Sequence, residues 1–342
     1  MKTLVQKYDR MNGKDLCEIT LINDHDVRAT VLNYGATLEK LEIPTGNNKR
    51  ENIIMSLATP KDYAKERNFL GGTVGRVAGR IKDGKWQHGN QITQFKLNDG
   101  QNSLHGGGEV GFDNKPWDFK VSSDKDTASV QLILFDPDGE NNYPGNMKII
   151  ATYQLDNDNN LNYNITAFTD KTTLFNPTNH TFFRLDGPQS NVEDLNLQLN
   201  ADYYVPVDDA TMPVAGMAKV ADTVFDFRKP KRLGAIINST AEPQIKNRNG
   251  LDHPFILNGY EPAAVLSSNK TNRKLIISTD AQAVVVFSAN TFNHQGAAKN
   301  IGRHDGITLE AQTAPESDYS LSSFTLVPGE RFSRTINWQV VY

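Results

Sequence analysis

Cysteine is almost absent from this sequence. The chain has one, Cys17, so no disulfide can form within it, which is the usual situation in the cytosol. The sequence also lacks any apolar stretch of the roughly 18 residues that a membrane helix requires. The first residues, MKTLVQKYDRMNG, contain no apolar run of the kind that marks a secretory signal peptide. We therefore expect a cytoplasmic protein that does not insert into a membrane.

Positive charge is not in excess. Lysine and arginine together number 36 against 40 aspartates and glutamates, which gives a formal net charge of −4. Basic residues form no block along the chain, so nucleic acid is not expected as a partner. Hydrophobic residues make up 38% of the chain and charged residues 22%, which is sufficient for a buried core and argues against disorder.

Helical patterning is scarce as well. No segment keeps a 3.6-residue apolar period, whereas short alternating segments separated by Asn, Asp and Gly recur along the chain. Neither a linker nor a low-complexity tract nor an internal repeat interrupts this pattern. We predict one large all-β domain over residues 1–342, built as a sandwich or a barrel. The clearest strand candidates are 27–43, 129–135, 194–200, 274–279, 283–289 and 336–342.

Local patterns predict several smaller features. Residues 85–97 form a hairpin candidate that turns at Gly89-Asn90, and residues 151–169 form a second one around DNDNN. In its second arm Leu161 and the alternate residues that follow share one face. One helical turn is predicted within residues 60–70. Cys17 lies in an apparent strand, where an inert thiol is expected.

The usual signatures of cofactor and nucleophile chemistry are missing. Seven histidines form no H-x-H or H-E-x-x-H pair and no cysteine cluster exists, so no metal site is predicted. The glycine-rich residues 71–80 lack the G-K-[ST] ending of a phosphate loop. A G-x-S-x-G elbow is absent too, which argues against an α/β-hydrolase.

What remains is a set of polar residues in unusual contexts. These are His105 before three glycines in NSLHGGG, Arg76 and Arg80 in GRVAGRI, His180 in NPTNHTFFRL, Asp252 in GLDHPF, and Glu310 in TLEAQTAPES. Glycines beside a histidine allow backbone to approach a ligand closely. Each motif alone has a structural explanation: Asn, Thr and aromatics around His180, for example, also suit a hydrogen-bonded core histidine.

Taken together, in this order and at this spacing, the motifs resemble those of the aldose 1-epimerases, or galactose mutarotases. The resemblance runs from about Leu4 to Val341. It implies a large single-domain β-sandwich with a sugar in an open cleft. It also implies interconversion of the α and β anomers of an unphosphorylated aldohexose, galactose or glucose, without a cofactor. A monosaccharide is then the partner, and the protein is a monomer or a homodimer.

The resemblance also implies roles for the residues. Glu310 matches the catalytic base and His180 the acid, which requires an ionised glutamate and a protonated histidine. Free histidine has a pKa of about 6.5, so we expect a neighbouring carboxylate, with Glu310 the obvious candidate, to raise the pKa of His180. Asn179 and Thr181 are expected to fix the orientation of its ring.

Three further residues match the sugar-binding groups of the family: Arg80, His105 and Asp252. Arginine donates hydrogen bonds to hydroxyls, aspartate accepts them and histidine does either. Arg80 is preferred over Arg76 because the family contact is the second arginine of G-R-x-x-N-R.

Two positions depart from the family pattern. Gly79 stands where the family usually has an Asn that contacts the sugar, and Val285 stands where some members have a polar residue. Both are expected to alter sugar preference. Phe287 or Trp117 is a candidate for stacking on an apolar sugar face, although a core position is the commoner explanation.

Three other functions compete with this one. A sugar-binding protein on the same scaffold would need no acid–base pair. A glycoside hydrolase would use Asp252 and Glu310 as paired carboxylates. A related family acts on hexose 6-phosphates and would need additional basic residues at the cleft.

Overall fold

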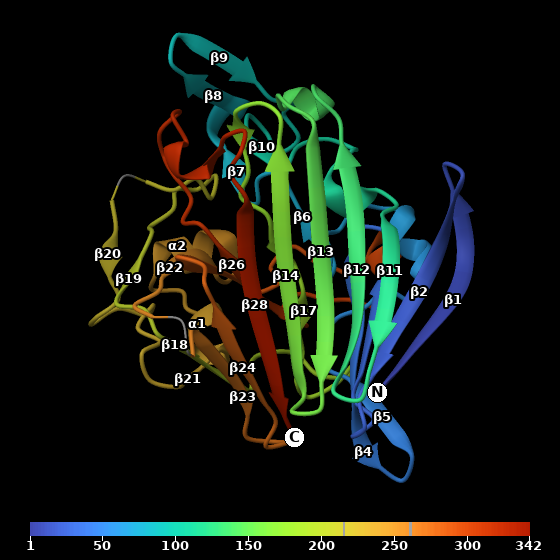
Figure 1. Ribbon diagram of the computed structural model, residues 1–342. Helices are drawn as coiled ribbons and strands as arrows, with labels where there is room; N and C mark the ends of the chain where they lie inside the picture. Colours follow the sequence, from blue (N-terminus) through green and yellow to red (C-terminus); the bar gives the residue numbers. More distant parts are fainter. Residues whose placement is uncertain (215, 260–261) are drawn as a thin grey trace.

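Strands dominate the computed structural model, which describes residues 1–214, 216–259 and 262–342 (Figure 1). Within these ranges, one sheet has nine strands. In spatial order they are β11 (Asp118–Ser123), β12 (Thr127–Asp136), β13 (Met147–Asp156), β14 (Asn160–Thr169), β28 (Phe332–Val341), β24 (Lys274–Thr279), β23 (Ala264–Ser268), β18 (Leu195–Leu199) and β21 (Lys231–Arg232).

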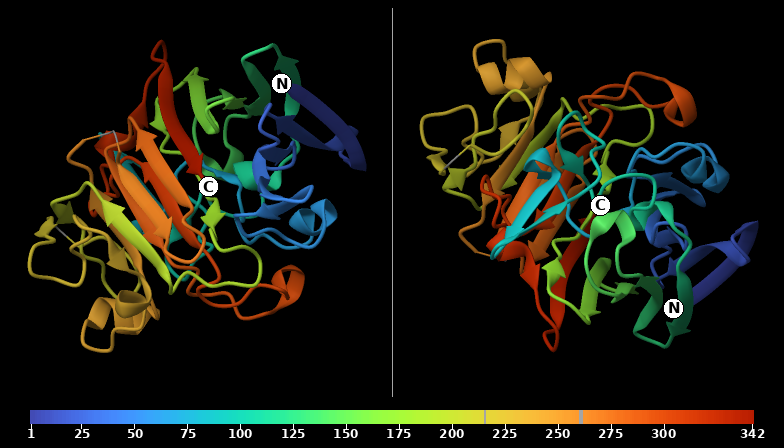
Figure 2. Two further views of the ribbon diagram at one scale, coloured as in Figure 1. Left: turned by 90° about the horizontal axis from the view of Figure 1, so that it is seen from below. Right: turned by 90° about the horizontal axis from the view of Figure 1, so that it is seen from above.

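Two further sheets complete the frame. The six-stranded sheet has the order β17 (Phe182–Phe183), β26 (Ile307–Gln312), β25 (Ala283–Phe287), β22 (Asp252–Ile256), β19 (Tyr203–Tyr204) and β20 (Ala218–Lys219). The five-stranded sheet runs from β1 to β5: β1 (Lys2–Met11), β2 (Lys14–Ile22), β3 (Arg28–Leu32), β4 (Thr37–Gly46) and β5 (Lys49–Asn52). In the end-on views, these N-terminal strands lie across the molecule from the yellow-to-gold segment around residues 200–250 (Figure 2).

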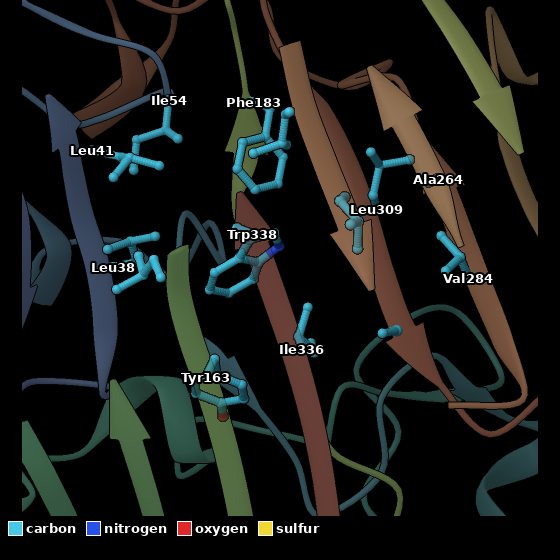
Figure 3. Packing of buried hydrophobic residues seen from close by; sticks show 14 of the residues in the cluster. Leu38, Leu41, Ile54, Tyr163, Phe183, Ala264, Val284, Leu309, Ile336 and Trp338 are labelled. Carbon is cyan, nitrogen blue, oxygen red and sulfur yellow. The ribbon is translucent and has the colours of Figure 1, made fainter. Parts of the chain in front are cut away.

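Side chains from different sheets meet in a shared core (Figure 3). Trp338 on β28 packs against Phe183 on β17 with ring centroids 6.0 Å apart, which joins the nine-stranded sheet to the six-stranded one. Tyr163 on β14 and Leu309 on β26 are buried in the same cluster. Sheets that face each other across a common core make a β-sandwich, so the predicted fold is confirmed and the barrel alternative is excluded.

The hairpin predictions are confirmed. β13 and β14 pair in antiparallel register with Tyr153 opposite Tyr163, and the Leu161 face of β14 is buried as expected. Asp156 closes the turn because its Oδ1 accepts the backbone N–H groups of Asp158 and Asn160. β8 (Lys85–His88) and β9 (Gln91–Gln94) form the other hairpin.

The predicted helical turn, the predicted strand 27–43 and the predicted position of Cys17 can each be compared with the structure. The helical turn predicted within residues 60–70 is the 3-10 helix η1 (Pro60–Ala64). The predicted strand 27–43 is interrupted: β3 and β4 are separated by a turn in which Gly35 and Ala36 have positive φ. Cys17 is buried in β2, where burial raises the pKa of its thiol. No helix among the described residues is long and apolar enough to cross a membrane.

Candidate active site

Three strands of the six-stranded sheet form the floor of a cleft with a volume of about 430 Å³. In the antiparallel register, Val285 of β25 lies opposite Glu310 of β26, and Phe287 lies opposite both Thr308 and Asp252. Residues opposite each other, and their neighbours two positions along, share one face of a sheet. The alternation of these strands therefore directs one polar set toward the cleft. The floor residues are Asp252, Pro254, Val285, Phe287, Glu310 and Gln312.

The walls of the cleft come from loops that are distant in sequence. The wall residues include Glu66, Asn68, Phe69, Gly79, Arg80, Leu104, His105, His180, Val207, Thr211, Pro213, Thr291, Phe292, Asn293 and Gln295. All five residues selected from the sequence border this one cavity: Arg80, His105, His180, Asp252 and Glu310.

The side chains of His180 and Glu310 meet directly. His180 Nε2 lies 3.3 Å from Glu310 Oε1, and both residues are buried. The hydroxyl of Thr308 donates a hydrogen bond of 2.9 Å to the same Oε1, which leaves Oε2 for another partner. His180 itself is held by its backbone, because its N–H donates to Gly72 and its carbonyl accepts from Gly71.

Burial shifts the acid–base properties of both groups toward their neutral forms. It raises the pKa of Glu310 to about 8 and lowers the pKa of His180 to about 4. The expected upward shift of the His180 pKa is therefore wrong, because the desolvation of a buried imidazolium outweighs the attraction of nearby carboxylates. Between these two values the pair holds one proton, the same number as in the ion pair that the chemistry requires.

Besides Glu310 and the ring of His105, whose centroid is 5.1 Å away, two phenylalanine rings pack against the imidazole of His180. Phe182 lies 5.0 Å away and Phe69 5.8 Å away, measured between ring centroids. Asn179 and Thr181 form no hydrogen bond with the ring. Asn179 Oδ1 accepts hydrogen bonds from the N–H and hydroxyl of Thr181, and thereby fixes the backbone on either side of His180.

His105 lies in a left-handed loop. His105, Gly106, Gly107 and Gly108 all have positive φ, at 49°, 80°, 77° and 39°. A Cβ on Gly106 would lie 1.9 Å from the carbonyl oxygen of Gly75, so only glycine fits there. Three successive glycines after a histidine are thus explained by backbone conformation.

Arg67 holds this loop from outside the cleft. Its guanidinium donates to the carbonyls of His105, Gly107 and Gly108, and it forms a bidentate pair with Asp113 at 2.8 and 2.7 Å. The N–H of Gly79 donates to Nδ1 of His105, which places the proton of the neutral ring on Nε2. Burial lowers the pKa of His105, so this neutral form is favoured.

The two arginines of GRVAGRI have different environments. Arg80 borders the cleft, where its Nε donates to Asp99 Oδ2 at 2.6 Å and its Nη1 lies 3.9 Å from Asp252 Oδ2. Arg76 is 1% exposed and pairs with Asp136 at 2.7 Å beneath the surface. Only Arg80 is placed to reach a ligand in the cleft.

The two departures from the family pattern both border the cleft. Gly79 has a φ of 74°, and a Cβ there would meet only Gln312 Nε2, at 3.8 Å. Val285 presents an apolar side chain beside Glu310. Phe287 also lines the cavity, whereas Trp117 is buried in the core and donates its indole N–H to Phe112.

Several residues that line the cleft were not expected from the sequence. Phe69, Asp99, Arg248 and Gln312 all line the cavity. Gln312 follows Glu310 by two positions in a strand and could have been placed on the same face. The other three lie in or at the ends of irregular segments, where no periodicity indicates direction.

Comparisons with known proteins agree with this architecture. A family model described as aldose 1-epimerase matches residues 18–339. The sequence is 31% identical over 343 residues to aldose 1-epimerase of Escherichia coli, with 96% of each chain covered. It is 31% identical over 318 residues to human galactose mutarotase, with 90% of each chain covered.

This chain belongs to the aldose 1-epimerase family.

A solved structure supports the same assignment. The crystal structure of galactose 1-epimerase from Lactobacillus acidophilus superposes with a TM-score of 0.93 at 56% identity, covering 99% of this chain and 98% of that one. Members of the aldose 1-epimerase family are isomerases that interconvert the anomers of small sugars, so the predicted enzyme class is confirmed.

Proposed function

We propose that this aldose 1-epimerase interconverts the α and β anomers of unphosphorylated galactose, and of glucose, with Glu310 as base and His180 as acid. The observation that carries the proposal is the contact between these two side chains in a buried cleft that also holds Arg80, His105 and Asp252. The name of the Lactobacillus acidophilus relative, galactose 1-epimerase, favours galactose.

The reaction needs only proton transfers. The carboxylate of Glu310 removes the proton of the C1 hydroxyl while the imidazolium of His180 donates a proton to the ring oxygen, and the C1–O5 bond breaks. The open aldehyde turns about C1–C2. The ring oxygen then attacks the other face of C1, and both protons return to where they began. Transfer of one proton between Oε1 and Nε2, across 3.3 Å, converts the neutral pair into this reactive form.

Arg80, His105 and Asp252 are proposed to bind the sugar hydroxyls. With its proton on Nε2, His105 is a donor toward the cleft, and Asp252 is an acceptor. The charges of the cleft favour a neutral sugar over a phosphate ester. Each of the two arginines that line it, Arg80 and Arg248, lies beside a carboxylate, so neither brings an uncompensated positive charge.

Polarimetry on freshly dissolved α-D-galactose and α-D-glucose tests this function. The protein should speed the approach to anomeric equilibrium without changing the end-point rotation. His180→Ala and Glu310→Ala should each abolish the acceleration. Full activity in either folded variant would refute the assigned roles. Acceleration confined to a hexose 6-phosphate would instead identify the enzyme as a hexose-6-phosphate epimerase.

The pKa values of the pair predict a bell-shaped pH profile for kcat/KM. Below a pH of about 4, His180 is protonated while Glu310 is also protonated, so the pair has no base and activity should fall. Above a pH of about 8, Glu310 is ionised while His180 is neutral, so the pair has no acid and activity should fall again. The measurement is kcat/KM for galactose from pH 3.5 to 9.5, corrected for the spontaneous reaction. A single limb near the ordinary histidine pKa of about 6.5 would contradict this assignment.

A further inference from the structure

Arg248 is a second arginine, besides Arg80, whose side chain lines the cleft. It is the last residue of α2 (Pro243–Arg248), a short helix capped by the side chain of Glu242. Its Nη1 donates to the backbone carbonyl of Asp209 at 3.3 Å, which fixes the direction of the side chain. The guanidinium lines the cavity and remains about one quarter exposed, at 27%.

Asp252 lies between this arginine and Arg80. Its Oδ2 is 3.7 Å from Arg248 Nη2 and 3.9 Å from Arg80 Nη1. Both distances exceed a hydrogen bond, and the carboxylate accepts none from the described residues. A carboxylate that faces a cleft between two arginines, without direct contact to either, has its hydrogen-bonding capacity open to a ligand.

The spacing fits hydroxyl groups. One hydroxyl oxygen, about 2.9 Å from each partner, can donate to Asp252 and accept from Arg248 at once, since those two atoms are 3.7 Å apart. A second hydroxyl can do the same between Asp252 and Arg80. Two adjacent hydroxyls on a pyranose offer this donor and acceptor pattern, and guanidinium groups supply donors in fixed directions.

We propose that Arg248 is a further sugar-binding residue, which together with Asp252 and Arg80 holds two adjacent hydroxyls of the substrate. The inference rests on the proposed function, which places C1 and the ring oxygen at Glu310 and His180.

Kinetics of Arg248→Met test the inference, because methionine keeps much of the length and removes all donors and the charge. KM for galactose should rise about 10- to 100-fold, as expected for a lost hydrogen bond to a charged group, while kcat stays within about 3-fold. Arg232→Met is the matched control. Arg232 is an exposed arginine paired with Asp194 outside the cleft, and this change should leave both constants unaltered.

Monodeoxy sugars identify the hydroxyl. Among 2-, 3-, 4- and 6-deoxygalactose, one should be turned over with a KM that Arg248→Met changes less than about 2-fold, because its missing hydroxyl is the one that Arg248 binds. An unchanged KM for galactose, or an equal loss on every deoxy sugar, would overturn the inference while leaving the proposed function intact. If the parent protein failed to accelerate mutarotation, calorimetric binding of galactose to the parent and to Arg248→Met would decide the inference separately: equal affinities would refute it.

Discussion

Glu310→Gln is expected to lower kcat for mutarotation by about 10²- to 10⁴-fold, the usual contribution of a positioned general base. Glutamine keeps the size of the side chain and can still accept the hydroxyl hydrogen bond of Thr308, so the geometry of the cleft is retained. It cannot remove the proton from the C1 hydroxyl. The initial rate of change of optical rotation on α-D-galactose, compared with that of the parent protein at the same pH, measures the loss of kcat.

The same substitution is expected to stabilise the folded protein. Burial raises the pKa of Glu310 to about 8 from 4.5, so the folded state binds a proton that the unfolded state releases. The contribution of Glu310 to the free energy of unfolding therefore falls as pH rises from about 4.5 to 8. At roughly 1.4 kcal/mol per pKa unit, glutamine removes a penalty of several kcal/mol at pH 8 and almost none at pH 4. Urea denaturation at both pH values measures the difference.

Glu39 provides a matched control. It is a second fully buried glutamate whose pKa burial raises to about 8, and it does not line the cleft. Glu39→Gln should raise stability at pH 8 in the same direction but leave kcat unchanged. If both variants lost activity to the same extent, the loss in Glu310→Gln would reflect a general disturbance rather than a missing base.

Asp136→Asn is expected to destabilise the protein by about 3–5 kcal/mol, the usual consequence of removing one partner from a buried ion pair. Asp136 lies 2.7 Å from Arg76 Nε and 2.5 Å from Lys115 Nζ. Arg76 also donates to the carbonyls of Pro144 and Gly145, so it cannot turn toward solvent. The substitution leaves a buried cation without its counter-charge.

Urea denaturation at pH 7 checks this prediction. Asp226→Asn is the control, because Asp226 pairs with Arg228 where both side chains are partly exposed, at 27% and 42%. Exposed pairs contribute at most about 1 kcal/mol. A loss below that value in Asp136→Asn would show that Arg76 finds other partners, and would remove the structural explanation for its position in GRVAGRI.

The strands could be predicted because alternation is a local property. The Leu161 face of β14 is buried as its sequence indicates, and the hairpin turn is specified by Asp156 and its neighbours. The predicted strand 27–43 was less exact. It is broken at Gly35 and Ala36, which both have positive φ, and alanine does not by itself indicate that conformation.

The residues of the site could be predicted from the sequence, but their pKa values could not. His180 and Glu310 are 130 positions apart, and their sequence motifs say nothing about the desolvation that sets their pKa values. Burial depends on which rings close around the pair, here Phe69 and Phe182, and this is decided by tertiary packing. Arg248 was missed for a different reason: it ends a helix of only six residues, which is too short to give a periodic signal.

The left-handed loop at His105 limits how this cleft can change. Any side chain at Gly106 would collide with the backbone at Gly75, and the loop carbonyls are already taken by Arg67. A single substitution there disrupts several contacts at once, so new sugar preferences cannot readily arise in that wall. Room for variation lies at Gly79, where a Cβ would meet only Gln312, and at Val285 and Arg248. Among enzymes with this cleft, the amino acids at those three positions should therefore vary more than those of the loop from His105 to Gly108.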